Sequence, residues 1–551
     1  MARTVGRLLV DSLEAHDIDL IYCVPGESYL GFTNALVDNN RMRLIVCRHE
    51  GGASFMAAAD GRMRGGRAGV VVVSRGPGLS NAMIGLHTAF HDATPLVVLI
   101  GQVERFEAGR MALQEQNYSR LLSDITKAVI EVNEPAQASE AIARAFHIAE
   151  SGTPGPVAII IPEDVFDVET DTPVAKPRAP AQSGPSQKDI DRLAEMLTAA
   201  ERPLIWAGTA IHPAEIADLT KLAEQWMIPV MPTHRRPHLF DAGHPNYGGY
   251  MASRVHADTL AEIKKTDLLI SLGERITGSI SQGFTFPAAP DPQIPLVHIW
   301  PDPNEVGRVW RADLAMPCEP AAVVRALLAK GAPPNAAKRK AWVDNLHAVH
   351  KRVTKAEWQP MTDGVNFAAV IAEINKRLTD DATVTSDAGN FATFVHRYLL
   401  MKPGQMFLAS VVGAMGAGLP MGVAACLRRP GTQVIAFAGD GGALMTGNEL
   451  ATARQYGVNP VFIVSDNNGY GTILQHHDAR YPGRPSRAAT QLTNPDFTVW
   501  ATAFGAKGLA IHTEDEIAPV IADALSTKDR PVVVHVHTSI EQISAWRRRS
   551  S

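Results

Sequence analysis

The amino-acid sequence predicts an α/β protein of three doubly wound domains, each built on a parallel β-sheet. Short uninterrupted runs of Val, Ile and Leu alternate with segments of helical periodicity, a pattern typical of parallel strands buried on both faces. Two stretches without periodicity interrupt the pattern, residues 171–188 and 330–340. Because such Pro- and Ala-rich stretches behave as linkers, we expect domains at 1–170, 186–335 and 360–551.

Each expected domain contains buried strands. The apolar runs are IVC at 45–47, VVVV at 70–73, LVVLI at 96–100, PLIWAG at 203–208, LLISLG at 268–273, VIAFAG at 434–439 and VFIVSD at 461–466.

Composition excludes several classes of protein. The chain has 551 residues, a net charge of −5 and basic residues spread along its length, so it lacks the electrostatic footprint of a nucleic-acid-binding protein. Its four cysteines form no CxxC pair, which argues against a zinc ribbon or a disulfide scaffold. We expect a cytoplasmic protein with reduced thiols and a core large enough to need no disulfides.

One segment resembles a membrane span in length. Residues 407–427 carry no charge over 21 positions, and about 20 apolar residues suffice to cross a bilayer. The run nevertheless contains four glycines and Pro420 and is rich in Ala. We interpret it as a loop and a helix of small residues packed in a core or an interface, and we expect no membrane partner.

The strongest chemical signal is GDGGALMTGNELATARQYGVNPVFIVSDNNGYGT, residues 439–472. Asp440 follows an apolar strand and precedes a helix expected over about 447–456, and Asn467 follows the next strand. Because neighbouring strands of a βαβ unit end at the same sheet edge, Asp440 and Asn467 should converge. Glycines and a helix N-terminus favour a phosphate, and hard oxygen ligands suit Mg²⁺. The alternative is a Gly-rich turn followed by an Asx turn.

This segment resembles the diphosphate-binding motif of thiamine diphosphate enzymes. The resemblance implies three metal ligands, which are Asp440, Asn467 and the backbone carbonyl of Gly469. It also implies that the cofactor contacts Gly439, Gly441, Gly442 and, in the SDAGN segment, Asn390.

A second segment, IVCRHEGGASFMAAADGRMRGG at 45–66, places Glu50 where a strand meets a helix. It resembles the RHE-containing segment of acetohydroxyacid synthases, which implies that Glu50 shares a proton with the cofactor's aminopyrimidine. SRGPGLSN at 74–81 resembles the family's loop near that ring and implies contacts from Pro77 and Asn81. Without the resemblance, Glu50 would be only an acidic residue at a helix N-terminus.

The segment VVGAMGAG resembles the part of the family that bends the cofactor. Met415 matches the bulky residue that forces the V conformation, and Gly413 offers a carbonyl to the 4′-amino group; a core methionine is the alternative for Met415. The resemblance covers essentially the whole chain, as pyrimidine-binding, central and diphosphate-binding domains. In this family the cofactor lies between the pyrimidine domain of one subunit and the diphosphate domain of another, which implies at least a homodimer.

Motifs around Gln114 (ALQEQN), Gly26 (VPGES) and Arg275 (SLGERITG) look most like acetohydroxyacid synthase. The resemblance implies that Gln114 lies near the reacting centre and that Arg275 grips the carboxylate of a second 2-oxo acid, although an ordinary ion pair is equally open for Arg275. Glu27 and His91 are further candidates for facing the substrate.

Three departures limit the resemblance. His476 stands where the synthases have a tryptophan that selects the larger second substrate, which argues against branched-chain specificity. The segment around Arg275 is shortened, and WAGTA at 206–210 replaces the family's GGG turn for flavin. We therefore expect no structural FAD.

The resulting hypothesis is a thiamine diphosphate- and Mg²⁺-dependent lyase or carboligase that acts on a pyruvate-like 2-oxo acid, acetolactate synthase-like in its leading version. A simple 2-oxo acid decarboxylase and a 2-hydroxyacyl-CoA or oxalyl-CoA type lyase are alternatives, and a CoA enzyme should show a nucleotide pocket in its central domain. A catalytically silent scaffold that binds the cofactor is the alternative from another class.

Overall fold

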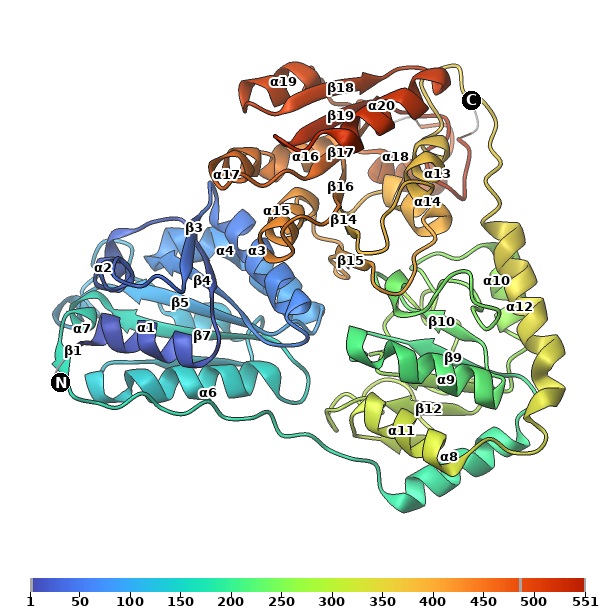
Figure 1. Cartoon of the computed structure of the whole chain (residues 1–551), viewed down its shortest axis with the longest axis horizontal. Helices are drawn as coiled ribbons and strands as arrows, with labels where there is room; N and C mark the ends of the chain where they lie inside the picture. Colours follow the sequence, from blue (N-terminus) through green and yellow to red (C-terminus); the bar gives the residue numbers. More distant parts are fainter. Residues whose placement is uncertain (1–2, 485–487, 550–551) are drawn as a thin grey trace.

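The computed structural model describes residues 3–484 and 488–549 and contains three parallel β-sheets, one in each domain of Figure 1. A short antiparallel pair joins β1 (Arg3–Thr4) to β8 (Glu169–Thr170). The fold class predicted from the sequence is confirmed. Within the described ranges, every helix is too short or too polar to cross a lipid bilayer.

The N-terminal domain has a six-stranded sheet in the order β3-β2-β4-β5-β7-β6. Its strands are β2 (Leu20–Cys23), β3 (Arg43–Val46), β4 (Gly69–Ser74), β5 (Leu96–Gln102), β6 (Ala128–Glu131) and β7 (Pro156–Pro162). Its helices are α1 (Val5–Ala15), α2 (Leu30–Leu36), α3 (Glu50–Met63), α4 (Arg75–His91), α5 (Tyr118–Leu122), α6 (Ala138–Glu150) and α7 (Glu163–Phe166). Val71 and Val73 face one hydrophobic core and Val70 and Val72 the other, so β4 is buried on both faces and its sequence is continuously apolar.

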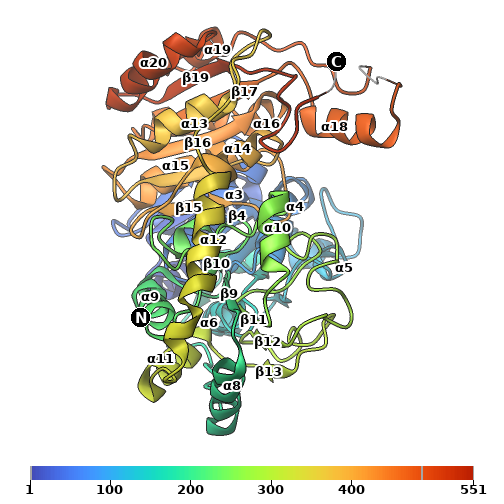
Figure 2. The same cartoon turned by 90° about the vertical axis from the view of Figure 1, so that its right-hand side faces the viewer.

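The central domain has a five-stranded sheet in the order β10-β9-β11-β12-β13. It follows residues 171–186, which have no regular secondary structure. Its strands are β9 (Pro203–Ala207), β10 (Val230–Pro232), β11 (Leu268–Leu272), β12 (Leu296–Ile299) and β13 (Leu314–Met316), and its helices are α8 (Gln187–Ala199), α9 (Ile216–Trp226), α10 (Ala257–Ile263) and α11 (Pro320–Lys330). In Figure 2, α12 (Lys340–Val353) leads upward from this domain toward the C-terminal one.

The C-terminal domain has a six-stranded sheet in the order β15-β14-β16-β17-β19-β18. Its strands are β14 (Thr383–Ser386), β15 (Met406–Ala409), β16 (Val434–Gly439), β17 (Val461–Asp466), β18 (Lys507–Ile511) and β19 (Val532–His537). Its helices are α13 (Phe367–Asn375), α14 (Phe391–Tyr398), α15 (Gly418–Arg428), α16 (Asp440–Thr446), α17 (Glu449–Gln455), α18 (Gly471–Arg480), α19 (Phe497–Ala503) and α20 (Glu514–Ser526).

Two local expectations are corrected. The helix expected over about 447–456 is present as α17, but an unexpected short helix, α16, precedes it: α16 begins at Asp440 directly after the strand, and Gly447 and Asn448 separate the two helices. A side chain at Gly447 would collide with Trp500, so the chain turns there against that ring. The uncharged run at 407–427 also begins inside β15, before the expected loop and the small-residue helix α15.

Helix α3 of the N-terminal domain packs against α15 of the C-terminal domain, and one hydrophobic core is continuous through Ala57 and Ala424. Arg428, at the end of α15, ties the two domains together. Its guanidinium donates to both carboxylate oxygens of Asp60, at 2.5 and 3.1 Å, and to those of Asp19, at 2.8 and 2.7 Å. Asp60 is only 1% exposed.

We predict that Arg428→Ala lowers the free energy of unfolding by about 3–5 kcal/mol, because it leaves the Asp60 carboxylate buried without a cation. Chemical denaturation followed by circular dichroism measures the change. Arg41→Ala is the matched control, since Arg41 makes its ion pair with Glu14 at the surface and such pairs contribute little. Equal stability of the two variants would contradict the prediction.

Candidate functional site

A cavity of about 250 Å³ lies at the carboxyl edge of the C-terminal sheet. The segments that follow β14, β16 and β17 form it together with the loop before α15. The sequence-predicted residues that line it are Asn390, Gly413, Met415, Gly439, Asp440, Gly442, Asn467 and Gly469. The convergence of Asp440 with Asn467 expected from the strand order is therefore present.

Asp440, the first residue of α16, is 4% exposed. Its carboxylate accepts hydrogen bonds from the backbone N–H of Gly441 and Gly469, each at 2.9 Å, and from Nδ2 of Asn494 at 2.9 Å. Burial raises the pKa of this carboxyl above its usual value, and the neighbouring Asp466 carboxylate acts in the same direction. A bound divalent cation would favour the charged form, because opposite charge offsets the cost of burial.

The side-chain oxygen of Asn467 has no hydrogen-bond partner, although it is buried. Leaving such an acceptor unpaired costs about 1–3 kcal/mol, so an unpaired oxygen beside a buried carboxylate indicates a missing electropositive partner. Carboxylate and amide oxygens are the donors that Mg²⁺ prefers. These oxygen atoms therefore fit a binding site for a hard divalent cation better than they fit the alternative, a purely structural turn.

The positions of Gly441 and Gly442 have no room for a side chain. A Cβ at Gly441 would lie 2.5 Å from the ring of Tyr470, and one at Gly442 would lie 2.0 Å from Oδ2 of Asp387. Close packing of backbone against these groups keeps the wall of the cavity open to a ligand.

Asp387 holds the loop before α15 in place and was not identified from the sequence. Its carboxylate accepts from the backbone N–H of Gly416 at 2.9 Å and of Ala417 at 3.3 Å. Burial raises its pKa to about 6, and these hydrogen bonds act in the opposite direction. The segment so held carries Met415 and Gly413, the latter with φ +77°. The acidic residue of SDAGN, next to the end of a strand, was the available signal.

Asn494 was also missed. Its Nδ2 donates to Asp440 at 2.9 Å and to Oδ1 of Asp466 at 2.8 Å, so one amide holds two neighbouring carboxylates in place. It lies in a loop that contains no recognisable motif, 54 positions from Asp440. Sequence spacing therefore could not predict its contact with Asp440.

Another set of expected residues gathers at the carboxyl edge of the N-terminal sheet. Glu50 begins α3 and accepts a hydrogen bond from Nδ2 of Asn81 at 2.9 Å. Gln114, with φ +66°, accepts through its carbonyl from the N–H of Gly76, which precedes the exposed Pro77. Gly26 packs against Ser74 so closely that a Cβ would lie 2.3 Å away, and the neighbouring Glu27 is exposed.

Glu449 connects this set to the C-terminal domain of the same chain. It is completely buried and accepts from the backbone N–H of Arg48 and His49, the two residues before Glu50. None of Glu50, Asn81 and Gln114 is among the described residues that line the C-terminal cavity. One chain therefore presents two partial sites at two different sheet edges.

Three family models match the chain in order. They are the N-terminal, central and C-terminal domains of thiamine pyrophosphate enzymes, over residues 3–121, 190–327 and 387–536. Similar proteins include a probable acetolactate synthase large subunit of Methanocaldococcus jannaschii, 30% identical over 95% of this chain and 90% of the relative. The chain belongs to the thiamine pyrophosphate enzymes.

Other relatives agree with this membership. Acetolactate synthase large subunits of Corynebacterium glutamicum and Lactococcus lactis are 29% and 28% identical, each over 96% of this chain, and over 86% and 92% of their own lengths. The protein is thus an acetolactate synthase-like enzyme that uses thiamine pyrophosphate, also called thiamine diphosphate.

In this thiamine pyrophosphate enzyme, three expected substrate residues lie outside the C-terminal cavity. Arg275 donates to the backbone carbonyl of His91, and its guanidinium lies 5.7 Å from the ring centre of Trp300. Arg275 and His91 therefore meet, but as a contact between the central and N-terminal domains. His476 is exposed on α18 and is not among the residues that line the cavity.

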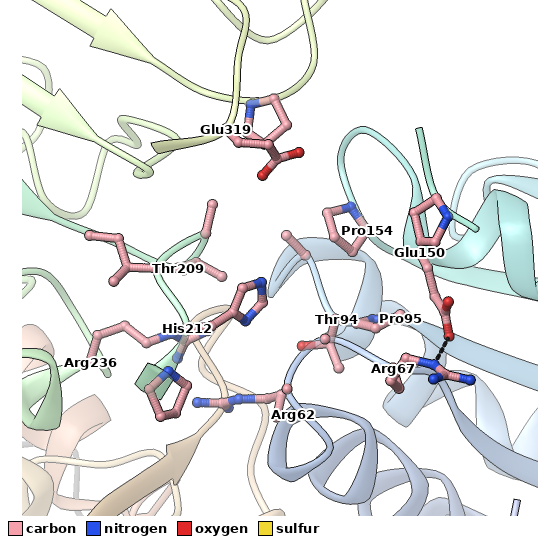
Figure 3. Close-up of a pocket in the computed structure, with 18 of the residues that line it drawn as sticks. Arg62, Arg67, Thr94, Pro95, Glu150, Pro154, Thr209, His212, Arg236 and Glu319 are labelled. Carbon is pink, nitrogen blue, oxygen red and sulfur yellow. Dashed lines mark ion pairs between the residues drawn. The ribbon is translucent and has the colours of Figure 1, made fainter. Parts of the chain in front are cut away.

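A second cavity, of about 350 Å³, lies between the N-terminal and central domains (Figure 3). Arg62, Arg236 and His212 border it, while Arg67 pairs with Glu150 at its rim. Nη2 of Arg236 is buried without a partner, so the cavity offers an unsatisfied cation to an anionic group.

We predict that Asp387→Asn weakens the binding of thiamine diphosphate about 10–100-fold, because hydrogen bonds to a charged acceptor contribute about 1.5–3 kcal/mol and the segment of Met415 would lose such an acceptor. Titration of the cofactor-free protein measures the affinity. The exposed Asp380→Asn serves as the control, and an unchanged affinity in Asp387→Asn would refute the role.

Proposed function

We propose that this enzyme decarboxylates pyruvate or a close 2-oxo acid and joins the resulting acyl unit to a second 2-oxo acid, in the manner of an acetolactate synthase. The observation that carries the proposal is the unpaired oxygen of Asn467 beside the buried carboxylate of Asp440. The names of the relatives, which cover nearly the whole chain, support the choice of reaction.

Asp440, Asn467 and the carbonyl of Gly469 would hold Mg²⁺, and the cation would hold the diphosphate. Asn390 would meet the diphosphate from the other wall, where its N–H donates to Thr472 and its side chain to Gln475. When bound, thiamine diphosphate supplies the electron sink for loss of CO₂, and the protein supplies orientation and a dry site.

Glu50 would hold and share the proton at N1′ of the aminopyrimidine. Asn81 fixes one carboxylate oxygen of Glu50 and leaves the other to the ring. Gln114, Gly26 and Glu27 would border the substrate from the same domain, and Pro77 would contact the ring. Met415 and Gly413 would shape the cofactor from the partner copy.

We propose a homodimer that shares its sites, because one chain presents two partial sites. Exposed apolar side chains in the segment before Gln114 support it: Phe106, Met111 and Leu113 are 65%, 96% and 74% exposed, and a subunit interface would bury them. We further propose that the enzyme is cytoplasmic, because its four cysteines are free thiols. We also propose that it binds no flavin, because the turn at 206–210 differs from the family's flavin turn.

We predict that Glu50→Gln slows exchange of the C2 proton of bound thiamine diphosphate about 10²–10⁴-fold, the usual contribution of a positioned acid or base. Quenched-flow exchange in deuterium oxide, read by NMR, measures the rate in the holoenzyme. Glu140→Gln, an exposed helical glutamate, is the control. Exchange that is equally slow in wild type and Glu50→Gln would instead support the silent scaffold.

Product analysis tests the reaction itself. Holoenzyme incubated with pyruvate, alone and with other 2-oxo acids as acceptors, should release CO₂ and form acetolactate. Acetaldehyde in its place would assign a simple decarboxylase, and absence of CO₂ would overturn the proposed reaction.

The second cavity favours one alternative, a lyase for acyl-CoA substrates, because its arginines suit phosphate groups. Binding of ADP or CoA to the holoenzyme, measured by calorimetry and lost in Arg236→Gln, would support that class. The proposed synthase predicts no turnover of acyl-CoA substrates.

A further inference from the structure

Three histidines and an aspartate gather at the carboxyl edge of the C-terminal sheet, outside the cavity of Asp440. Asp466 ends β17, His535 and His537 belong to β19, and His512 follows β18. These three strands are neighbours in the sheet. The register pairs residue 464 with His535 and Asp466 with His537. Because alternate residues share a face, Asp466, His535 and His537 project from the same side.

The donor atoms of Asp466, His535 and His537 lie within 4.8 Å of one another. Nε2 of His535 is 2.8 Å from Oδ2 of Asp466, and the two imidazole centres are 4.1 Å apart. Zinc–ligand bonds of about 2.0–2.1 Å put tetrahedral donors about 3.3 Å apart. A bound metal ion would therefore lengthen the contact between His535 and Asp466 by about 0.5 Å and would bring the more widely separated donor atoms closer together.

Hydrogen bonds hold Asp466 in place, and a carboxylate lies near His535. Oδ1 of Asp466 accepts from the N–H of Asn468 and from Asn494, both at 2.8 Å. Nδ1 of His535 lies 4.0 Å from Oδ1 of Asp496, which is longer than a hydrogen bond, so the ring must approach this carboxylate on metal binding. Asp496 is itself fixed by the N–H and hydroxyl of Thr498. A carboxylate behind a ligating imidazole sets its tautomer and raises its basicity.

We propose that Asp466, His535 and His537 bind a divalent transition metal of the Zn²⁺ or Co²⁺ class. Two imidazoles and one carboxylate suit such metals, whereas the oxygen-only set of Asp440 and Asn467 suits Mg²⁺. The open fourth position would be filled by water. His512 stacks on His537, with the ring centres 4.2 Å apart.

This site is adjacent to the cofactor cavity and linked to it. The amide of Asn494 donates to Asp466 and to Asp440, so a metal held by Asp466 would fix the amide that orients Asp440. The reaction proposed above does not depend on this metal, and the metal site does not depend on that reaction.

Cobalt binding tests the proposal. Protein freed of metals by a chelator and then saturated with thiamine diphosphate and Mg²⁺ is titrated with Co²⁺ and followed by visible absorption. We expect each chain to bind one Co²⁺ in addition to its Mg²⁺. The bound Co²⁺ should give the intense visible absorption of cobalt with few ligands, among them nitrogen, and Zn²⁺ should displace it. His537→Asn should abolish this signal, and Asp496→Asn should weaken binding about 10-fold through the ring of His535.

The matched control is His147→Asn, which removes a partly exposed histidine whose Nδ1 lies 3.2 Å from the backbone carbonyl of Ala179. It should bind Co²⁺ like wild type. Asp496 is 59% exposed, so Asp496→Asn keeps the test decisive if His537→Asn fails to fold. Absence of the cobalt spectrum in the wild-type protein would overturn the proposal. Equal Co²⁺ affinity of Asp496→Asn and wild type would also overturn it. In either case His535 would be only an ion-pair partner of Asp466.

Discussion

The buried carboxylate of Asp440 is the group on which the rest of the site depends. A charge taken out of water needs hydrogen bonds and a partner of opposite sign. Two backbone N–H groups and Asn494 supply the hydrogen bonds, and the unpaired oxygen of Asn467 completes a set of donors for a cation. The parallel order of β16 and β17 brings these groups to one edge, and the glycines keep that edge accessible.

The second constraint is that the chain divides its chemistry between two sheet edges. Helix α3, which begins at Glu50, packs against α15 of the same chain. Arg428 of α15 and Glu449 of α17 add polar contacts between the two domains. The contact places Glu50 away from the residues that line the cavity of Asp440. The domains of one chain thus support each other structurally, and in the proposed dimer a second copy would complete each cofactor site.

Sequence reasoning succeeded where the signal is local or follows from the topology of parallel sheets. Continuous apolar runs located the seven expected strands, and the strand-end rule predicted that Asp440 and Asn467 converge. Sequence reasoning did not identify Asp387, Asn494 and Glu449, because each forms hydrogen bonds with groups that are far away in the sequence. The docking of Arg275 on the carbonyl of His91 was equally hidden, since the contact depends on how two domains meet.

Complementation between two inactive chains measures the central claim most directly. Glu50→Gln and Asp440→Asn are co-expressed with different affinity tags, and mixed dimers are isolated. If each site combines Glu50 of one copy with Asp440 of the other, a mixed dimer keeps one intact site of two and regains about half of the wild-type activity with pyruvate. Mixed dimers as inactive as either parent would contradict the shared site.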